Sequence, residues 1–457
     1  MKIGKGAYTP SLKKEELRTS EYAENQQSAG VAWRCIRSAS SNFKIYANAV
    51  LPFYEFPHDC TMEHVTIQEL YDAYYDCRKH KRNKKSAIDF EIGYETELIK
   101  LHRELNNGAY RKSPCIVFCV TRPKLREVFA ADFRDRIVQH LLMLRFETIF
   151  EKRMIDTSYS CRKGKGTLYG IKQTQREIEE ISNGYADNAY ILTCDIKGFF
   201  MSIDRHKVLR MVDEVLKEED VEDLQYWRWL WSLVILTPCE ENCRKVGDLS
   251  LFEKLPKEKS ILKNKGRGLP IGDVTSHYLS NLYLTLFDKW AKAFLGDNGR
   301  YGRYADDWVA VHKDKERLLS MLPEARKFLK ENLNLTLHPD KIYLQEAKKG
   351  VKFCGAVVKQ KRLYISNTTL KSVYYAVDRY NSGQQDLQSF CQTINSLLGL
   401  LGHFATYAIR WEIWISIQDK NELCSHRMQK ILPARRSSSR TPSYCVKETQ
   451  TSSQQNL

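Results

Sequence analysis

Apolar residues recur along this chain at two spacings, which divide it into helical and extended segments. Helical spacing, with apolar residues three or four positions apart, covers residues 64–85, 90–107, 133–152, 205–236, 274–295, 315–332 and 367–415. Runs of β-branched and aromatic residues typical of strands cover residues 113–131, 190–194, 300–313, 334–345 and 351–358. The pattern predicts a globular protein of mixed helices and strands, in the α+β class.

One helical segment carries a dense set of aromatic residues. Within residues 205–236 these are Tyr226, Trp227, Trp229 and Trp231. Aromatic side chains of this size remove a large apolar area from water when they are buried. The pattern therefore favours packing in the hydrophobic core over stacking on nucleic-acid bases.

The charge balance narrows the class of partner. The chain of 457 residues has 72 Lys and Arg against 56 Asp and Glu, and its formal net charge of +16 is spread along the whole length. Such a balance favours a polyanionic partner, through charge attraction and counterion release. We find no apolar run long enough to span a bilayer and no secretory signal. We expect a nucleic-acid partner, no membrane partner and a cytoplasmic location.

Three aspartates stand at the ends of apolar strands. Asp195 follows the run YILTC, and Asp306 and Asp307 lie in a turn between the runs RYGRY and WVAVH. A lone pair of aspartates is most often a turn or capping feature. An acidic pair between apolar strands is costly to bury without a partner, however, and Asp195 adds to that cost. Carboxylates of this kind suit Mg²⁺, and two such ions can catalyse an in-line phosphoryl displacement.

At these residues the chain resembles a known family, the prokaryotic reverse transcriptases. Members carry an aspartate followed five positions later by an aromatic residue, as in Asp195 and Phe200, and then the motif YxDD, here residues 304–307. The resemblance implies a right-hand polymerase fold with fingers, palm and thumb. It also implies that the three aspartates are catalytic and hold two Mg²⁺ ions, or Mn²⁺ in their place, together with the backbone carbonyl of Ile196.

The same resemblance covers roughly residues 64–415 and implies how the chain divides. We expect an N-terminal extension without assigned role, fingers that begin with a basic helix, a palm with part of the fingers inserted, a helical thumb, and a polar, largely disordered tail. Their expected bounds are, in that order, residues 1–63, 64–189, 190–365, 366–415 and 416–457.

Six positions match family positions that contact the incoming nucleotide. The ring of Phe200 implies a steric gate against a ribose 2′-OH. An aliphatic residue before Gly272, where many retroviral relatives have glutamine, implies lower fidelity. The family has a lysine near the pyrophosphate, a candidate general acid, where this chain has Lys341. The expected nucleotide-binding residues are Lys124, Arg126, Phe200, Ile271, Gly272 and Lys341.

Two basic segments are expected to contact nucleic-acid phosphates. The first follows the helical segment that begins at residue 64, and the second is the block SYSCRKGKGT, which resembles a fingers motif of the family. Most charge runs are solvated helix ends, and for the first segment that interpretation weighs as much as a phosphate contact. The residues concerned are Arg78, Lys79, Lys81, Arg82, Lys84 and Lys85 in the first segment and Arg162, Lys163 and Lys165 in the second.

Within the family, blocks such as KHKRNKKSAIDFE and LPKEKSILKNKGRGLPIG most resemble the error-prone enzymes of diversity-generating retroelements. The resemblance implies synthesis of cDNA on an RNA template from a DNA or RNA primer and dNTPs, with a structured non-coding RNA and a small basic accessory protein as further partners. Asp273 and His277 depart from that group, which has Asn and Gln there. Defence-associated (antiphage) reverse transcriptases share most of these blocks and remain an alternative. A non-catalytic nucleic-acid-binding protein is a third reading, against which the three intact aspartates argue.

Overall fold

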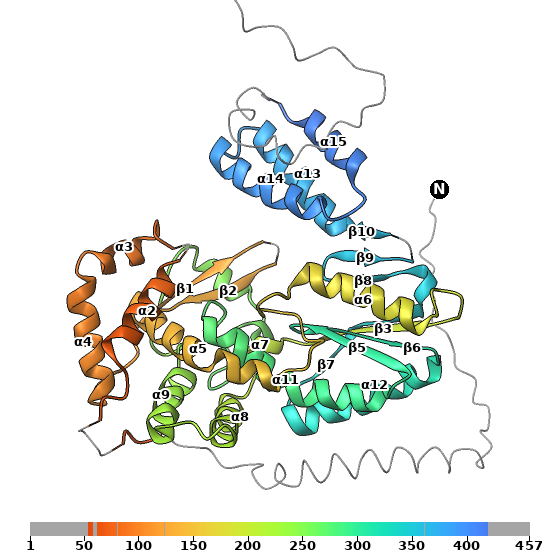
Figure 1. The fold of residues 1–457 in the computed structure, drawn as a ribbon. Helices are drawn as coiled ribbons and strands as arrows, with labels where there is room; N and C mark the ends of the chain where they lie inside the picture. The colour runs from red at the N-terminus through yellow and green to blue at the C-terminus, as the bar shows by residue number, and fades with distance from the viewer. Residues whose placement is uncertain (1–53, 58–61, 80, 123, 361, 419–457) are drawn as a thin grey trace, which may run out of the picture. The chain divides into compact units, whose positions relative to one another are not determined.

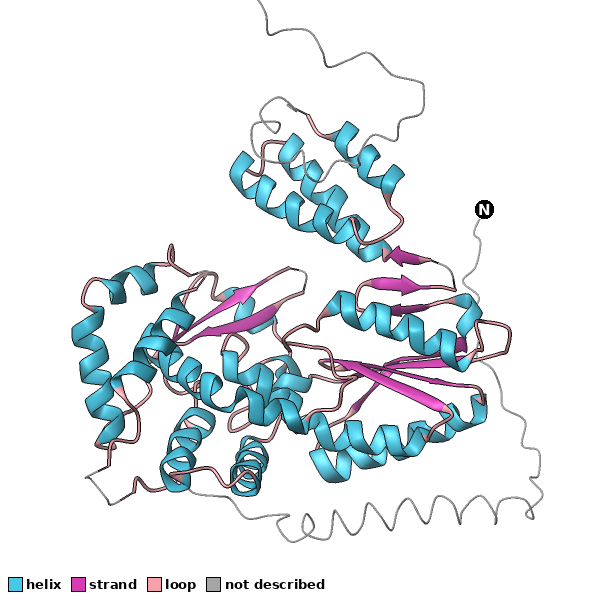
Figure 2. Cartoon of the chain, in the orientation of Figure 1, coloured by secondary structure: helices cyan, strands magenta, loops and turns pink. Residues whose placement is uncertain are grey.

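The chain is described here by a computed structural model that covers residues 54–57, 62–79, 81–122, 124–360 and 362–418. Most of the expected N-terminal extension lies outside the described residues, as does the expected polar tail beyond residue 418. The chain forms two compact units, one reaching to residue 354 with 358–360 added, the other formed by 355–357 and the residues after 360. Helices and strands are mixed along it (Figure 1, Figure 2), which confirms the α+β class.

A four-stranded antiparallel sheet, called the central sheet from here on, organises the first unit. Its strand order is β5 (Gly299–Tyr304), β6 (Asp307–His312), β3 (Tyr190–Ile196) and β7 (Leu337–Glu346). β3 lies inside the sheet and pairs with β6 on one side and β7 on the other. This inner position explains why its sequence, YILTCDI, is an almost continuous apolar run.

Helices cover both faces of the central sheet. α6 (Thr167–Ile181) lies on one face, while α11 (Val274–Leu295) and α12 (Lys315–Leu333) lie on the other (Figure 1). The ring of Phe287 in α11 lies edge-on to Trp308 of β6 at a centroid distance of 5.6 Å. Because both faces are covered, the inner strands β3 and β6 are largely buried.

A second, smaller sheet joins distant parts of the chain. β1 (Cys115–Val120) pairs antiparallel with β2 (Arg126–Ala130) and parallel with β4 (Cys243–Lys245). β4 comes from the segment between β3 and the later strands of the central sheet. The chain therefore returns from the central sheet to complete the small sheet.

Five helices enclose the rest of the main core. They are α2 (Ile67–Arg78), α4 (Tyr94–Asn106), α5 (Phe133–Arg153), α8 (Arg205–Glu218) and α9 (Leu224–Leu236). The aromatic set in α9 belongs to this core, with Trp227 and Trp231 fully buried. The expectation that these rings pack in the core is confirmed.

Several of the expected helical segments are interrupted, among them 64–85 and 205–236. The segment 64–85 is helical only from Ile67, after a capping box formed by Thr66 and Glu69, to Arg78, and α3 (Lys85–Glu91) then begins a new helix. The segment 205–236 divides at Asp220 and Asp223, whose φ angles of 47° and 56° are left-handed. Apolar spacing continued through both breaks, because it reports buried faces and not backbone continuity.

The remaining elements are short or belong to the second unit. In the first unit they are α7 (Phe199–Ser202), α10 (Ser250–Lys254), β8 (Val351–Phe353) and two 3₁₀ turns, Lys257–Lys259 and Ala347–Lys349. β9 (Ala356–Val358) and β10 (Leu363–Ile365) pair with each other and precede three helices, α13 (Asn367–Asn381), α14 (Leu387–Leu401) and α15 (Tyr407–Ser416). Within the described residues no helix is long and apolar enough to cross a bilayer.

One buried carboxyl group on α6 makes the stability of the fold depend on pH. Glu177 is 1% exposed, and one of its carboxyl oxygens accepts a hydrogen bond of 3.4 Å from the Tyr159 hydroxyl while the other has no partner. Burial raises the pKa of Glu177 from 4.5 to about 7. The unfolded chain therefore loses this proton at a lower pH than the folded chain, so folding stability falls as pH rises from about 4.5 to about 7.

We therefore expect Glu177→Gln to stabilise the protein at neutral pH. Relative to the parent chain, its free energy of unfolding should rise by on the order of 2–3 kcal/mol between pH 4.5 and pH 8. Urea denaturation at both values measures this difference. Glu179→Gln, on the exposed side of the same helix, is the matched control. An unchanged difference between the Glu177 variant and the parent at the two pH values would contradict the prediction.

Candidate active site

The three predicted aspartates lie together where β3 and β6 are paired. Asp195 is the direct cross-strand partner of Asp307, and Asp306 precedes it in the turn between β5 and β6. The pairing of β3 with β7 shifts register between Cys194 and Ile196, so on that side the ladder is irregular at the position of Asp195. Residues more than one hundred positions apart are thus brought to one point.

The carboxylates repel one another, and burial increases that repulsion. Desolvation and the charge of Asp195 raise the pKa of Asp306. Desolvation, followed by the charges of Asp306 and Asp195, raises the pKa of Asp307 to about 7. The ammonium group of Lys341 on β7 lies 2.5 Å from Asp195 Oδ2 and offsets part of the negative charge. The predicted neighbour of the pyrophosphate therefore lies at the carboxylates themselves.

This set of donors fits a divalent cation of the Mg²⁺ type. Within the described residues, no group of three or more His, Cys, Asp or Glu side chains is placed so that it could hold a metal ion by itself. Mg²⁺ does not require such a group, because it commonly uses one or two protein carboxylates and completes its shell with water and substrate phosphates. The raised pKa values of Asp306 and Asp307 mark a place where added positive charge is favourable. The Ile196 amide donates to the Asp306 carbonyl at 3.2 Å, so the predicted backbone ligand borders the turn.

Phe200, the predicted sugar gate, lies in the short helix α7 directly after β3. Its ring is partly buried and meets the ring of His277 edge-on, at a centroid distance of 6.1 Å. Its backbone carbonyl accepts a hydrogen bond of 2.9 Å from the Leu269 amide. The gate residue and the segment that carries Ile271 are therefore joined directly.

The segment with Ile271 and Gly272 is bound to the small sheet. The Phe129 amide of β2 donates to the Ile271 carbonyl at 2.8 Å. Gly272 has a φ of 126°, and a Cβ atom there would lie 2.2 Å from the Phe129 carbonyl oxygen. Only glycine permits this approach, so the position of Ile271 depends on β2.

The loop that leads to this segment is held by two buried acidic side chains, which the sequence analysis did not single out. The guanidinium of Arg205 pairs with Glu240 at 2.8 Å and donates to the Gly268 carbonyl at 2.7 Å. Glu240 in turn accepts from the Gly266 amide at 2.9 Å. Glu127, which is fully buried in β2, accepts from the Ser260 hydroxyl. Residue type alone gave no signal, because most Arg and Glu residues are exposed.

The predicted triphosphate cations are exposed at the start of β2. Lys124 and Arg126 are both exposed to solvent, whereas Glu127, the second residue of β2, is buried. The charge of Arg126 lowers the pKa of Asp306, in opposition to the larger effect of burial, so its guanidinium acts on the carboxylate group. A cation at the start of β2 therefore contributes positive potential at the carboxylates.

The first basic segment is partly occupied by protein contacts. Arg78 pairs with Glu91, and Lys79 pairs with Asp76 at 2.9 Å. The Lys81 ammonium lies 3.4 Å from a histidine ring of α5. Lys79 is exposed despite its ion pair, and Arg82, Lys84 and Lys85 are exposed as well.

The second basic segment is held more tightly. Arg162 is buried and its guanidinium binds Glu151 at 2.6 Å, while the Lys165 ammonium donates to a backbone carbonyl at 2.8 Å. Lys163 is exposed and pairs with Glu147 at 2.7 Å. Arg162 therefore fixes its own loop, which favours a structural role over the expected phosphate contact.

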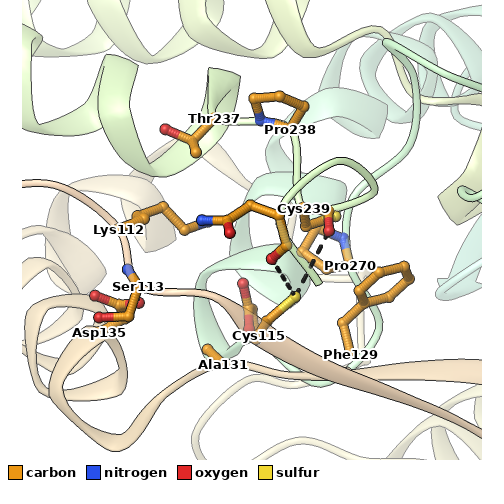
Figure 3. A pocket seen from close by; sticks show the side chains of 12 residues that line it. Lys112, Ser113, Cys115, Phe129, Ala131, Asp135, Thr237, Pro238, Cys239 and Pro270 are labelled. Atoms are coloured by element: carbon orange, nitrogen blue, oxygen red, sulfur yellow. Dashed lines mark hydrogen bonds between the residues drawn. The ribbon is translucent and has the colours of Figure 1, made fainter. Parts of the chain in front are cut away.

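A small pocket borders the segment with Ile271. Pro270, Asp273 and Cys115 are among the residues that line it, and the Cys115 thiol donates to the Cys239 carbonyl at 3.6 Å (Figure 3). Asp273, one of the departures from the retroelement group, is 4% exposed, and burial raises its pKa. The pocket belongs to the packing that supports the segment.

A comparison with protein families decides between the classes that this geometry allows. The family described as "Reverse transcriptase (RNA-dependent DNA polymerase)" matches residues 112–358, which is more than half of the 457 residues. The chain belongs to the reverse transcriptase family. The right-hand polymerase fold and the class of RNA-directed DNA polymerase, both expected from the sequence, are thereby confirmed.

Proteins similar to this reverse transcriptase include a bacterial protein and a group II intron-encoded protein. Protein YkfC of Escherichia coli (strain K12) is 23% identical over 61% of this chain and 74% of that protein. Group II intron-encoded protein LtrA of Lactococcus lactis subsp. cremoris is 23% identical over 48% of this chain and 33% of that protein, so the chain spans a third of LtrA. A solved structure of apo telomerase from Candida tropicalis has 9% identity and a TM-score of 0.41, over 69% of this chain and 59% of that one.

We expect Phe200→Ala to weaken the choice of deoxynucleotides over ribonucleotides by this reverse transcriptase. Removing the ring opens space under the sugar, and the ratio of kcat/KM for dNTP over rNTP should fall by at least about tenfold. Single-nucleotide extension with matched dNTP and rNTP measures the ratio. Phe199→Ala, which removes the neighbouring buried ring, controls for loss of packing. If the ratio of kcat/KM for dNTP over rNTP falls equally in both variants, Phe200 is not the steric gate.

Proposed function

We propose that this reverse transcriptase synthesises cDNA on an RNA template by nucleotidyl transfer at Asp195, Asp306 and Asp307. The observation that carries the proposal is the direct pairing of Asp195 with Asp307 across β3 and β6, with Asp306 beside them in the turn. Two Mg²⁺ ions bound there, or Mn²⁺, would supply the charge that activates an attacking 3′-hydroxyl and stabilises the leaving oxygens. The substrates are dNTPs, an RNA template and a DNA or RNA primer.

The chain's own residues supply orientation and further charge. Arg126 and Lys124 lie on the exposed start of β2 and would hold the triphosphate. Phe200 would face the sugar and exclude a 2′-OH. Lys341, which pairs with Asp195 at 2.5 Å, would turn to the pyrophosphate and give it a proton or a compensating charge.

The nucleic acid would extend beyond these groups along basic surfaces. Exposed cations between α2 and α3 offer contacts that depend on charge and not on base sequence. Such contacts weaken as salt concentration rises, because binding releases counterions. The residues best placed for this role are Arg82, Lys84, Lys85 and Lys163.

Substitution of Asp306 tests the proposed reaction. We expect Asp306→Ala to lower primer extension on a primed RNA template with Mg²⁺ and dNTPs by at least about 10³-fold, because a charge-stabilising ligand worth several kcal/mol is lost. Asp297→Ala, at an exposed loop position close to β5, is the control and should extend normally. Undiminished extension by Asp306→Ala would show that the extension does not take place at these carboxylates and would sink the proposal. Absence of extension by the parent protein would leave the non-catalytic nucleic-acid-binding alternative.

Within the family we propose the error-prone enzyme of a diversity-generating retroelement. The aliphatic Ile271 supports this proposal, since its backbone is fixed by β2 while its side chain offers no hydrogen bond to hold a nucleotide strictly in place. A structured non-coding RNA and a small basic accessory protein would be its further partners. The alternative is a defence-associated reverse transcriptase, and a template repeat and variable repeat beside the gene, as against a phage-defence cluster, would decide between them.

The fidelity of the enzyme tests the role of Ile271. We expect Ile271→Gln to lower the misincorporation frequency by about threefold to tenfold, because one added hydrogen bond contributes about 0.5–1.5 kcal/mol of discrimination. Sequencing of cDNA copied from a defined RNA template measures the frequency. Ile271→Leu keeps the side chain aliphatic and should leave it unchanged. Equal misincorporation frequencies in the parent and the Gln variant would show that Ile271 does not set the fidelity.

A further inference from the structure

A buried ion pair lies directly beneath the turn that carries Asp306. Arg303 in β5 is 0% exposed, and its guanidinium meets the carboxylate of Asp288 in α11 through two contacts of 2.7 Å. The Tyr301 hydroxyl also donates to Asp288, at 2.8 Å. Both charges are removed from water, so the pair persists only because each hydrogen-bonding group has a partner.

The guanidinium of Arg303 uses all five of its N–H groups. Two go to Asp288, and the other three go to the Asn281 side-chain oxygen at 3.2 Å, the Ser158 hydroxyl at 3.2 Å and the Ala305 carbonyl at 2.9 Å. A planar fork with five donors is specific to arginine. A lysine in this position would keep the charge but could not make the same set of contacts.

The contact with Ala305 reaches the catalytic turn itself. Ala305 has a φ of 54°, a left-handed conformation that is uncommon for a residue other than glycine. Such a conformation persists where its surroundings determine it. The Arg303 guanidinium holds the Ala305 carbonyl in this turn, and the next two residues are Asp306 and Asp307.

The same arginine joins the turn to residues 157–160, at the start of the second basic segment. Its backbone amide donates to the Thr157 carbonyl at 2.9 Å, and its carbonyl accepts from the Tyr159 amide at 2.9 Å. Asn281, already bound to the guanidinium, donates to the Ser160 carbonyl at 2.8 Å. Residues 157–160, α11 and the turn are therefore tied to one side chain.

We infer that Arg303 is a positioning residue that, with Asp288, sets the place of the Asp306 and Asp307 carboxylates for nucleotidyl transfer. The inference rests on the proposed polymerase activity and adds a residue that touches neither nucleotide nor primer. A displacement of the turn by about 1 Å is enough to slow a reaction by about 10²-fold. The nucleotide contacts at Arg126 and Ile271 lie on other elements, so such a displacement acts on kcat more than on KM.

The test compares variants that separate folding from positioning. Arg303→Lys keeps a positive charge beside Asp288 but loses the contact fork. The double variant Arg303→Gln/Asp288→Asn leaves no buried charge unpaired and keeps polar groups for Tyr301 and Asn281. Arg228→Lys, at the ion pair of Arg228 with Asp213 between α8 and α9, is the control for loss of an arginine ion pair away from the turn. For each protein, single-nucleotide extension gives kcat and KM for dNTP, and thermal unfolding gives Tm.

We expect kcat of Arg303→Lys to fall by about 10²-fold, with KM for dNTP changing less than about threefold, at a Tm like that of the control variant. The double variant should show the same loss of kcat even if Arg303→Lys does not fold. Values of kcat near that of the parent in either folded variant would overturn the inference. So would a rise in KM as large as the fall in kcat, or an equal loss of kcat in the Arg228 control.

The parent protein separates the two proposals. If the parent extends primers and Asp306→Ala does not, the polymerase function stands, and the Arg303 variants then test positioning alone. If the parent itself does not extend a primed RNA template, the proposed function fails before the variants are compared.

Discussion

Mutual repulsion among Asp195, Asp306 and Asp307 is the constraint on which the rest of the first unit depends. Three negative charges at the end of a buried sheet favour separation, and the pairing of β3 with β6 prevents it. A shift of one residue in that pairing would turn every side chain of β3 to the opposite face. The packing of Ile191 and Leu192, which are both fully buried, therefore keeps Asp195 beside the two other carboxylates. The Lys341 ammonium group offsets part of that negative charge, and a divalent cation would offset the remainder.

Buried ion pairs hold the segments around these carboxylates. Arg303 with Asp288 supports the turn, and Arg205 with Glu240 supports the approach to Ile271. Pairs of this kind add little net stability, because removal of two charges from water offsets their attraction. Their value here is geometric, since a charged group with every hydrogen bond satisfied admits very few arrangements. The packing against the central and small sheets supplies the stability that such pairs do not.

The small sheet connects the expected nucleotide contacts. β2 carries Arg126 at its exposed start and binds the Ile271 carbonyl through the Phe129 amide. A movement of β2 would thus shift a triphosphate cation and the segment with Ile271 together. Gly272 makes this possible, because any other residue would collide with the Phe129 carbonyl. Charge and shape at the nucleotide are in this way coupled through one strand.

The sequence by itself determined most of the helical and extended segments and the places of the three aspartates at the ends of strands, because these depend on local spacing and on motifs that fall within a few residues. The buried aromatic residues of α9 followed from the same spacing. Tertiary structure alone decided which charged residues are buried. Arg162, for which a phosphate contact was expected, is buried and binds Glu151. Arg303, Arg205 and Glu127 are also buried, although no feature of the neighbouring sequence indicates it. Their partners stand far away in the chain, and a charge is buried only where folding brings such a partner to it.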